Sequence, residues 1–115
     1  MNIKELIGWQ DFEKIDMRVG TIVKAEAFAK ARKPAYQLLI DFGADLGLKK
    51  SSAQITNLYQ PQDLIGKQII AVVNFPPKQI ANFISECLVL GVLGLNGDVT
   101  LLTTSLGTAN GLQIA

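Results

Sequence analysis

Alternation of apolar and polar residues along short runs restricts the fold of this 115-residue chain more than any other feature. In residues 36–42 (YQLLIDF), every second side chain from Tyr36 to Phe42 falls on one apolar face. Successive side chains of a strand point to opposite faces, so a period of two predicts strands with one covered face. Because such runs recur from Asp16 towards the C-terminus, the chain is predicted to be all-β.

Six segments are predicted to be strands: 16–26, 36–42, 49–55, 68–74, 84–92 and 99–103. A short helix at Pro61–Ile65, stopped by Gly66, separates the third strand from the fourth, and the Asn96-Gly97-Asp98 turn predicts a hairpin. An SH3-like barrel or a small sandwich fits this strand count. The helix between strands 3 and 4 favours a five-stranded Greek-key barrel of the OB-fold type.

The first and third predicted strands carry the clearest face assignments. In the first, Val19, Thr21 and Val23 are expected to face one way and Lys24 and Glu26 the other. Gly20 in this strand indicates a bend or a bulge.

In the third strand, Ser51, Ala53 and Ile55 are expected to face the barrel interior. Lys50, Ser52 and Gln54 then form an outward polar row, which is either a binding face or an ordinary solvated face.

The N-terminal segment is predicted to be an amphipathic helix over Asn2–Gln10, capped by Asn2 and ended by Gly8. Its apolar stripe consists of Ile3, Leu6 and Ile7 with Trp9 beside it. A small barrel offers little room to bury this stripe, and the last 17 residues carry no charged side chain. We therefore expect residues 1–115 to form one domain that assembles as a homodimer, with residues 1–10 as a dimerisation helix.

Composition argues against enzymatic chemistry. The chain has no His and a single Cys, Cys87, so the sequence offers no imidazole base, His-ligated metal or intrachain disulfide. It also lacks the GxxxxGK[ST] and GxGxxG motifs of nucleotide-binding loops. An inert core thiol is the better interpretation of Cys87. We predict a protein that is not an enzyme and that needs no metal and no cofactor.

The sequence contains neither a signal-peptide pattern nor an apolar run long enough for a membrane span. The most apolar stretch, Ile84–Leu95, is interrupted by Ser85, Glu86 and two glycines. A soluble, cytoplasmic protein without membrane insertion is expected.

Basic residues are concentrated in the middle of the chain. Residues 30–78 contain seven basic and three acidic residues, although the whole chain has a net charge of only +1. The loop with Lys30, Arg32 and Lys33 is expected to lie beside the Lys50 row, with Lys78 near the same rim. Such cations suit phosphate contacts, and the aromatic rings of Phe75 and Tyr36 are candidates for stacking on unpaired bases. At this alternation, however, Tyr36 is more often a core residue.

Four segments closely resemble the stand-alone tRNA-binding domain, which is also appended to some methionyl- and phenylalanyl-tRNA synthetases. They are residues 11–20 (DFEKIDMRVG), residues 59–67 (YQPQDLIGK), residues 74–78 (NFPPK) and Ser85-Glu86. Residues 31–36 (ARKPAY), 49–55 (KKSSAQI) and 74–77 are still closer to one branch of that family, the CsaA protein-secretion chaperones.

The resemblance implies an OB fold, a homodimer and tRNA binding without catalysis. For the CsaA branch it also implies a chaperone role with exported preproteins. Two departures lie near the expected RNA face: Cys87-Leu88 replaces Gly-Met after Ser-Glu, and Ala53-Gln54 replaces Ser-Gly. The predicted RNA-binding residues are Arg32, Lys33, Lys50, Ser52, Gln54, Asn74, Phe75, Lys78, Ser85 and Glu86.

Overall fold

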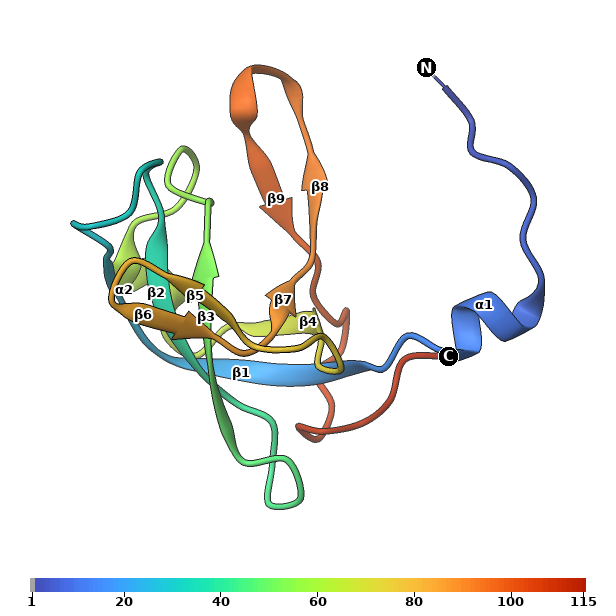
Figure 1. The fold of residues 1–115 in the computed structure, drawn as a ribbon. Coiled ribbons are helices and arrows are strands. Elements are labelled where there is room, and N and C mark those ends of the chain that lie inside the picture. The colour runs from blue at the N-terminus through green and yellow to red at the C-terminus, as the bar shows by residue number, and fades with distance from the viewer. Residues whose placement is uncertain (1) are drawn as a thin grey trace.

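A five-stranded antiparallel sheet in the order β3-β2-β1-β4-β7 forms the body of the computed structural model, which describes residues 2–115 (Figure 1). Its strands are β1 (Met17–Ala27), β2 (Tyr36–Asp41), β3 (Leu48–Ala53), β4 (Gln68–Val72) and β7 (Leu88–Val89). Two hairpins complete the fold: β5 (Lys78–Ile80) with β6 (Phe83–Ser85), and β8 (Gly91–Leu93) with β9 (Val99–Leu101).

Hydrogen bonds between β3 and residues 85–87 bring the two edges of this sheet together. The Lys50 N–H donates to Glu86 Oε1 at 2.9 Å, and the Glu86 N–H donates to the Lys50 carbonyl at 2.7 Å. The Ser52 N–H donates to Ser85 Oγ at 3.1 Å. The sheet is therefore a nearly closed five-stranded barrel, and the predicted all-β, OB-type fold is confirmed.

The alternating side chains that the sequence assigns to the interior fill this barrel. The fully buried large side chains are Ile22, Leu38, Ile40, Phe42, Leu64 and Ile69. Ser51 is buried as well, and its hydroxyl donates to the Cys87 carbonyl at 2.9 Å, which offsets the cost of enclosing a polar group. Ala53 and Ile55 are also buried. The interior assignment of Ser51, Ala53 and Ile55 is therefore confirmed.

The face assignment of β1 fails at a β-bulge. The register against β2 shifts between Ile22 and Lys24, so that Ile22 is fully buried while Val23 is 43% exposed. An extra residue reverses the alternation beyond it. The predicted irregularity in this strand exists, but it lies at Val23 rather than at Gly20.

The helix predicted over Asn2–Gln10 is wrong. Residues 2–8 have no regular secondary structure, and helix α1 spans Trp9–Glu13. Gly8 begins this helix, because its N–H donates to the Asp11 carboxylate at 3.1 Å. Ile3 and Leu6 are 92% and 101% exposed, so the apolar stripe packs against nothing within residues 2–115. A two-turn helix without such packing is not stable in water.

Other boundaries also differ from the prediction. The expected strand 84–92 is divided into β6, β7 and β8, because residues 85–87 turn aside to bond with β3. Lys78, which lies between the predicted strands 68–74 and 84–92, begins β5. The helix between strands 3 and 4 is confirmed as α2 (Pro61–Leu64), and the predicted turn near residue 97 is the short 3-10 helix η1 (Leu95–Gly97) between β8 and β9.

The C-terminal residues return to β1. The Val19 N–H donates to the Leu112 carbonyl at 3.1 Å, and the Ile114 N–H donates to the Met17 carbonyl at 2.9 Å. Within residues 2–115, no helix has the length and apolarity needed to cross a membrane.

Candidate nucleic-acid interface

The outer face of β1, β2 and β3 carries a compact set of polar side chains. The strand registers place Lys24, Leu39 and Lys50 in one cross-strand row and Glu26, Gln37 and Ser52 in the next. Both rows lie on the side of the sheet away from the buried interior. Strands β1, β2 and β3 therefore form a meander, and the polar face of β3 continues across β2 to β1.

An aromatic ring stands at the edge of this face. The Lys50 ammonium lies 5.3 Å from the centroid of the Phe83 ring, which is a cation–π distance. Phe83 in turn packs edge-on against Phe28, with ring centroids 5.4 Å apart and an interplanar angle of 61°. Because Phe28 is buried, the Phe83 ring is held in place beside the polar rows.

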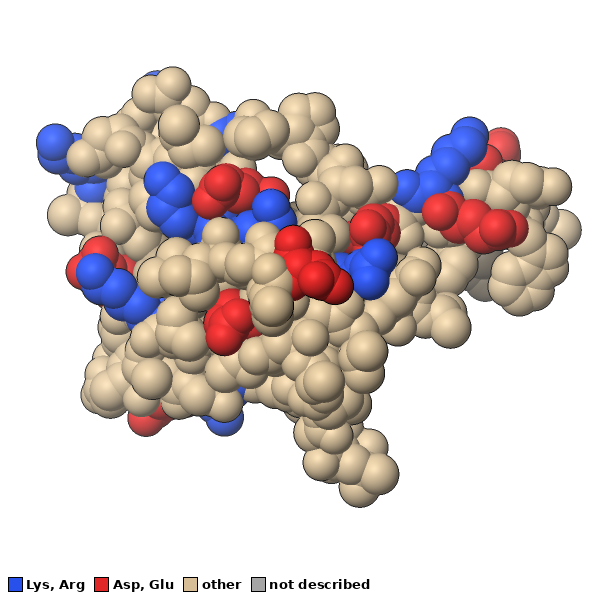
Figure 2. Space-filling view, turned by 90° about the horizontal axis from the view of Figure 1, so that it is seen from below, with Lys and Arg blue, Asp and Glu red and all other residues tan. Residues whose placement is uncertain are grey.

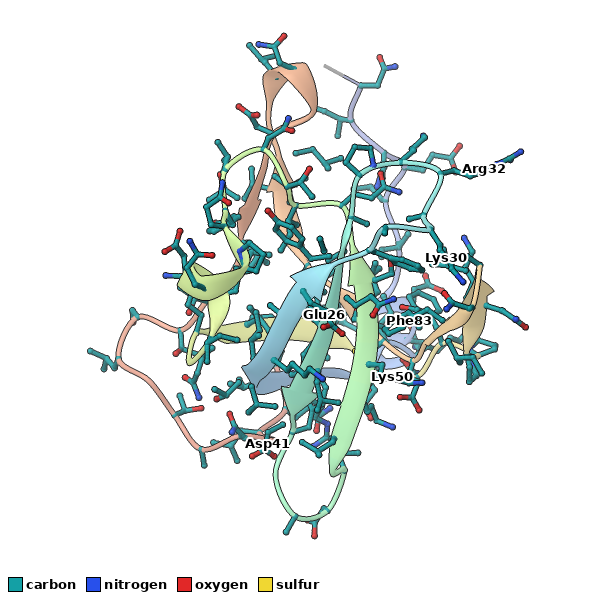
Figure 3. All side chains as sticks on the ribbon, turned by 90° about the vertical axis from the view of Figure 1, so that its left-hand side faces the viewer. Glu26, Lys30, Arg32, Asp41, Lys50 and Phe83 are labelled. Atoms are coloured by element: carbon teal, nitrogen blue, oxygen red, sulfur yellow. The ribbon has the colours of Figure 1, made fainter. Side chains whose placement is uncertain are left out.

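A groove of about 230 Å³ runs between these side chains. Its lining residues are Lys24, Glu26, Gln37, Leu38, Leu39, Lys50 and Phe83. Figure 3 shows Glu26, Phe83 and Lys50 gathered on the side of the molecule that faces the viewer, with Lys30 above them at the rim and Arg32 farther out. Positive groups thus surround a floor that contains one carboxylate and one aromatic ring.

The structure brings several predicted site residues to this face. Lys50 and Ser52 lie in it, and Gln54 follows at the end of β3 with its side chain exposed. Arg32 and Lys33 are exposed in the β1–β2 loop. These five residues lie on the three neighbouring strands or their connecting loop.

Three other predicted site residues lie at the closing contact of the barrel. Lys78 pairs with Ser85, and the Ser85 hydroxyl bonds to Ser52, so Lys78 lies beside the β3 edge. Ser85 and Glu86 use their side-chain oxygens to bond β3 backbone N–H groups.

Two further predicted site residues, Asn74 and Phe75, lie in the β4–β5 loop. The Asn74 side chain accepts from the Asp16 N–H at 2.9 Å and donates to the Lys14 carbonyl at 2.7 Å, so it joins this loop to the segment entering β1. Phe75 next to it is 54% exposed. Tyr36, the other stacking candidate, lies in the core, as the alternation of its strand favours: its ring is buried and its hydroxyl donates to the Tyr59 carbonyl at 2.7 Å.

Apart from Leu38, whose side chain is buried in the core, sequence reasoning missed five groove residues: Lys24, Glu26, Gln37, Leu39 and Phe83. A signal for four of them was present, because alternation in the first two strands placed Lys24 with Glu26 and Gln37 with Leu39. Only the cross-strand register shows that these pairs meet Lys50. Phe83 lies just before the predicted strand 84–92. Its ring reaches the groove because Phe83 belongs to the β5–β6 hairpin, which the sequence did not predict.

The electrostatics of the molecule are mixed. Figure 2 shows acidic and basic side chains interspersed over the side that it presents, with the N-terminal arm extending at the right. The one ion pair among residues 2–115 joins Arg18 to Asp16 at 2.6 Å, and it lies beside a second hollow of about 350 Å³ near Asn110. Within that described range, no three His, Cys, Asp or Glu side chains are grouped as a metal site.

The only thiol of the chain, that of Cys87, is buried in the barrel core. Burial raises the pKa of Cys87 from 9.0 to about 11, which suppresses the reactive thiolate at neutral pH. The prediction of an inert core thiol agrees with this environment.

Comparison with known proteins identifies the family of the chain. Residues 17–113 match the model of the "putative tRNA binding domain" family. A chaperone CsaA from Bacillus anthracis str. Ames has 53% sequence identity and a TM-score of 0.91 over 96% of this chain and all of that one. The CsaA chaperone protein of Picrophilus torridus has 57% identity and a TM-score of 0.90 over the same shares.

The chain belongs to the tRNA-binding domain family, in its CsaA branch. A methionine–tRNA ligase of Parabacteroides distasonis also carries this domain, with 33% identity over 103 residues. The match covers 88% of this chain but only 14% of the ligase. The tRNA-binding domain thus occurs both as nearly the whole of short CsaA proteins and as a small part of a methionine–tRNA ligase.

Proposed function

We propose that this chain binds tRNA, without catalysing a reaction on it, through the outer face of β1–β3 and the loops that border it. The proposed binding residues, which either contact RNA or position those that do, are Arg32, Lys33, Lys50, Ser52, Gln54, Asn74, Phe75, Lys78, Ser85 and Glu86. The observation that carries the proposal is the convergence on this face of Lys24, Lys50 and the β1–β2 loop cations in a member of the tRNA-binding domain family. The cytoplasm, where tRNA is used, is the proposed location.

Lysine and arginine bind phosphates mainly through charge, so the contacts have a measurable salt dependence. Each phosphate contact that is lost reduces the slope of log affinity against log salt concentration by about 0.7 to 0.9. The exposed Lys33, Lys50 and Lys78 side chains make no ion pair within residues 2–115, and their removal leaves the core untouched. Ser85 and Glu86 hold the β3 backbone in position, and Asn74 holds the β4–β5 loop against the segment that enters β1.

The test measures tRNA affinity over a salt series for Lys33→Ala, Lys50→Ala and Lys78→Ala. We expect each variant to weaken binding and flatten the salt dependence with little change in melting temperature. Lys14→Ala and Lys67→Ala are the matched controls, because both lysines are exposed and away from the groove. Equal losses in the controls would show that the face is misassigned, and no tRNA binding by the wild type at low salt would refute the function.

The second part of the proposal is a homodimer. The arm of residues 2–8 exposes Ile3, Leu6 and Ile7, and the protruding β8–β9 hairpin exposes Leu93 and Leu95, each by 85% (Figure 1). An apolar arm separated from its own barrel is better covered by a second chain than by water. Two subunits also double the number of cations offered to one RNA.

A second candidate function is that of an export-related chaperone for unfolded preproteins. Both solved relatives are described as chaperones, and apolar side chains are exposed beside the same face, including Phe75 and Ile84 at 54% and 45%. Competition between tRNA and an unfolded preprotein distinguishes the candidates. If the protein binds the preprotein and Lys50→Ala does not weaken that binding, the preprotein binds at an apolar site separate from the basic face.

A further inference from the structure

We propose that the groove beside Phe83 binds one unpaired guanine base of an RNA. This inference rests on the proposed tRNA binding and adds a base-selective subsite to it. The starting point is an acidic residue among basic ones. Glu26 lines the groove together with Lys24 and Lys50, and it lies in the row next to theirs, where a carboxylate repels phosphate. The only ion pair of the described chain joins Arg18 to Asp16, so no cation neutralises Glu26 there.

A free carboxylate accepts hydrogen bonds from a base edge that carries donors. Guanine presents two adjacent donors on its Watson–Crick edge, the N1–H and the N2 amino group, which match the two oxygens of one carboxylate. Cytosine and adenine present a single amino group, and uracil a single N–H. In single-stranded RNA these edges are accessible to protein side chains. Glu26 therefore selects guanine, and Gln37, opposite it on β2, supplies an amide donor for the guanine O6.

The Phe83 ring provides the stacking surface. Its position is fixed by the edge-on contact with Phe28, and Lys50 covers the ring at 5.3 Å in the absence of RNA. Base–aromatic stacking is stronger than a cation–π contact at an exposed site. A base entering the groove therefore displaces the ammonium, which becomes available to the phosphate of the same nucleotide. The groove volume of about 230 Å³ accommodates one base.

The experiment compares fluorescein-labelled RNA tetranucleotides that differ at one position, UUGU, UUAU, UUCU and UUUU, by fluorescence anisotropy at low salt. We expect UUGU to bind at least fivefold more tightly than the others. Inosine at the same position, which lacks the N2 amino group, should lose most of that preference. Glu26→Gln should abolish the preference, and Phe83→Leu should weaken UUGU binding about tenfold. Glu13→Gln, on exposed α1, is the matched control and should change nothing.

Two results overturn the inference. One is equal binding, or equal absence of binding, of the four tetranucleotides; the other is an unchanged preference in Glu26→Gln. Wild-type affinity for intact tRNA is measured in parallel. If tRNA binds while the tetranucleotides are not distinguished, only the guanine subsite fails; if tRNA does not bind, the proposed function fails too.

Discussion

Polar residues beside the candidate face are of two kinds. In the first kind, a side-chain oxygen already accepts a hydrogen bond from a backbone N–H group of this chain, as in Ser85, Glu86 and Asn74. Lys33 and Lys50 have exposed charged groups that are available to a ligand. The sequence motifs shared with the tRNA-binding domain family therefore contain two kinds of residue. Some stabilise the backbone of the candidate face, and others are exposed for contact with a ligand.

Gly20 lies on β1 where the packed core leaves no room for a side chain. A Cβ there would lie 2.6 Å from Ile40 Cγ2 and 2.8 Å from the Phe42 ring, both inside the core. We predict that Gly20→Ala lowers the free energy of unfolding by about 1–3 kcal/mol through overpacking. Urea denaturation measures it. Gly94→Ala, where the nearest atoms are 3.4 Å away, is the matched control, and an equal loss there would contradict the packing explanation.

The raised pKa of Cys87 predicts slow thiol chemistry. At pH 8 a thiol of pKa about 11 is about a hundredfold less ionised than one of pKa 9.0, so the folded protein should react with a disulfide reagent at least a hundredfold more slowly than the urea-unfolded protein. Its rate should rise about tenfold per pH unit towards pH 11. Fast labelling of the folded protein at pH 8 would show that the thiol is accessible.

The same shift links Cys87 to stability. The folded state holds the thiol proton more tightly than the unfolded state does. The contribution of Cys87 to the free energy of unfolding is therefore complete below pH 9 and is lost as the pH rises from 9 to 11.

At the scale of elements, the contact between β3 and residues 85–87 is where an open sheet becomes a barrel. It brings side-chain acceptors to an edge strand whose N–H groups would otherwise be unpaired. The outer face of β3 and the position of Phe83 both depend on this closure, since β6 directly precedes it.

We predict that Glu86→Ala lowers the free energy of unfolding by about 1 kcal/mol, because the Lys50 N–H loses its acceptor. Glu86→Gln keeps an oxygen at that position and should restore most of the stability as well as the tRNA affinity. Thermal melting and tRNA binding are measured on both variants. If Glu86→Gln loses tRNA binding while keeping its stability, the carboxylate contacts RNA directly.

At the scale of the whole molecule, the exposed arm is the feature that one chain does not explain. Light scattering at micromolar concentration should give about twice the chain mass of 12.5 kDa. Leu6→Glu, at a side chain 101% exposed, should shift the protein towards monomers without lowering the stability of the barrel. Leu48→Glu, at a half-exposed leucine on β3, is the control. A wild-type monomer with an intact fold would refute the dimer.

The sequence by itself determined the strand pattern, the helix between β3 and β4 and the two faces of β3. Each follows from residues that are neighbours in the chain: a period of two, a Pro-initiated turn ended by Gly66, and small or apolar residues at 51, 53 and 55. Local signals of this kind need no partner from elsewhere in the fold.

Only the tertiary structure decided the bulge at Val23, the division of residues 84–92 and the groove of Glu26, Lys50 and Phe83. These features depend on which strands meet and in which register, and on hydrogen bonds between residues more than thirty positions apart, such as that of Lys50 with Glu86. The same reason explains why the helix over Asn2–Gln10 was wrong. Its apolar stripe predicts a helix only if another surface covers it, and in the single chain none does.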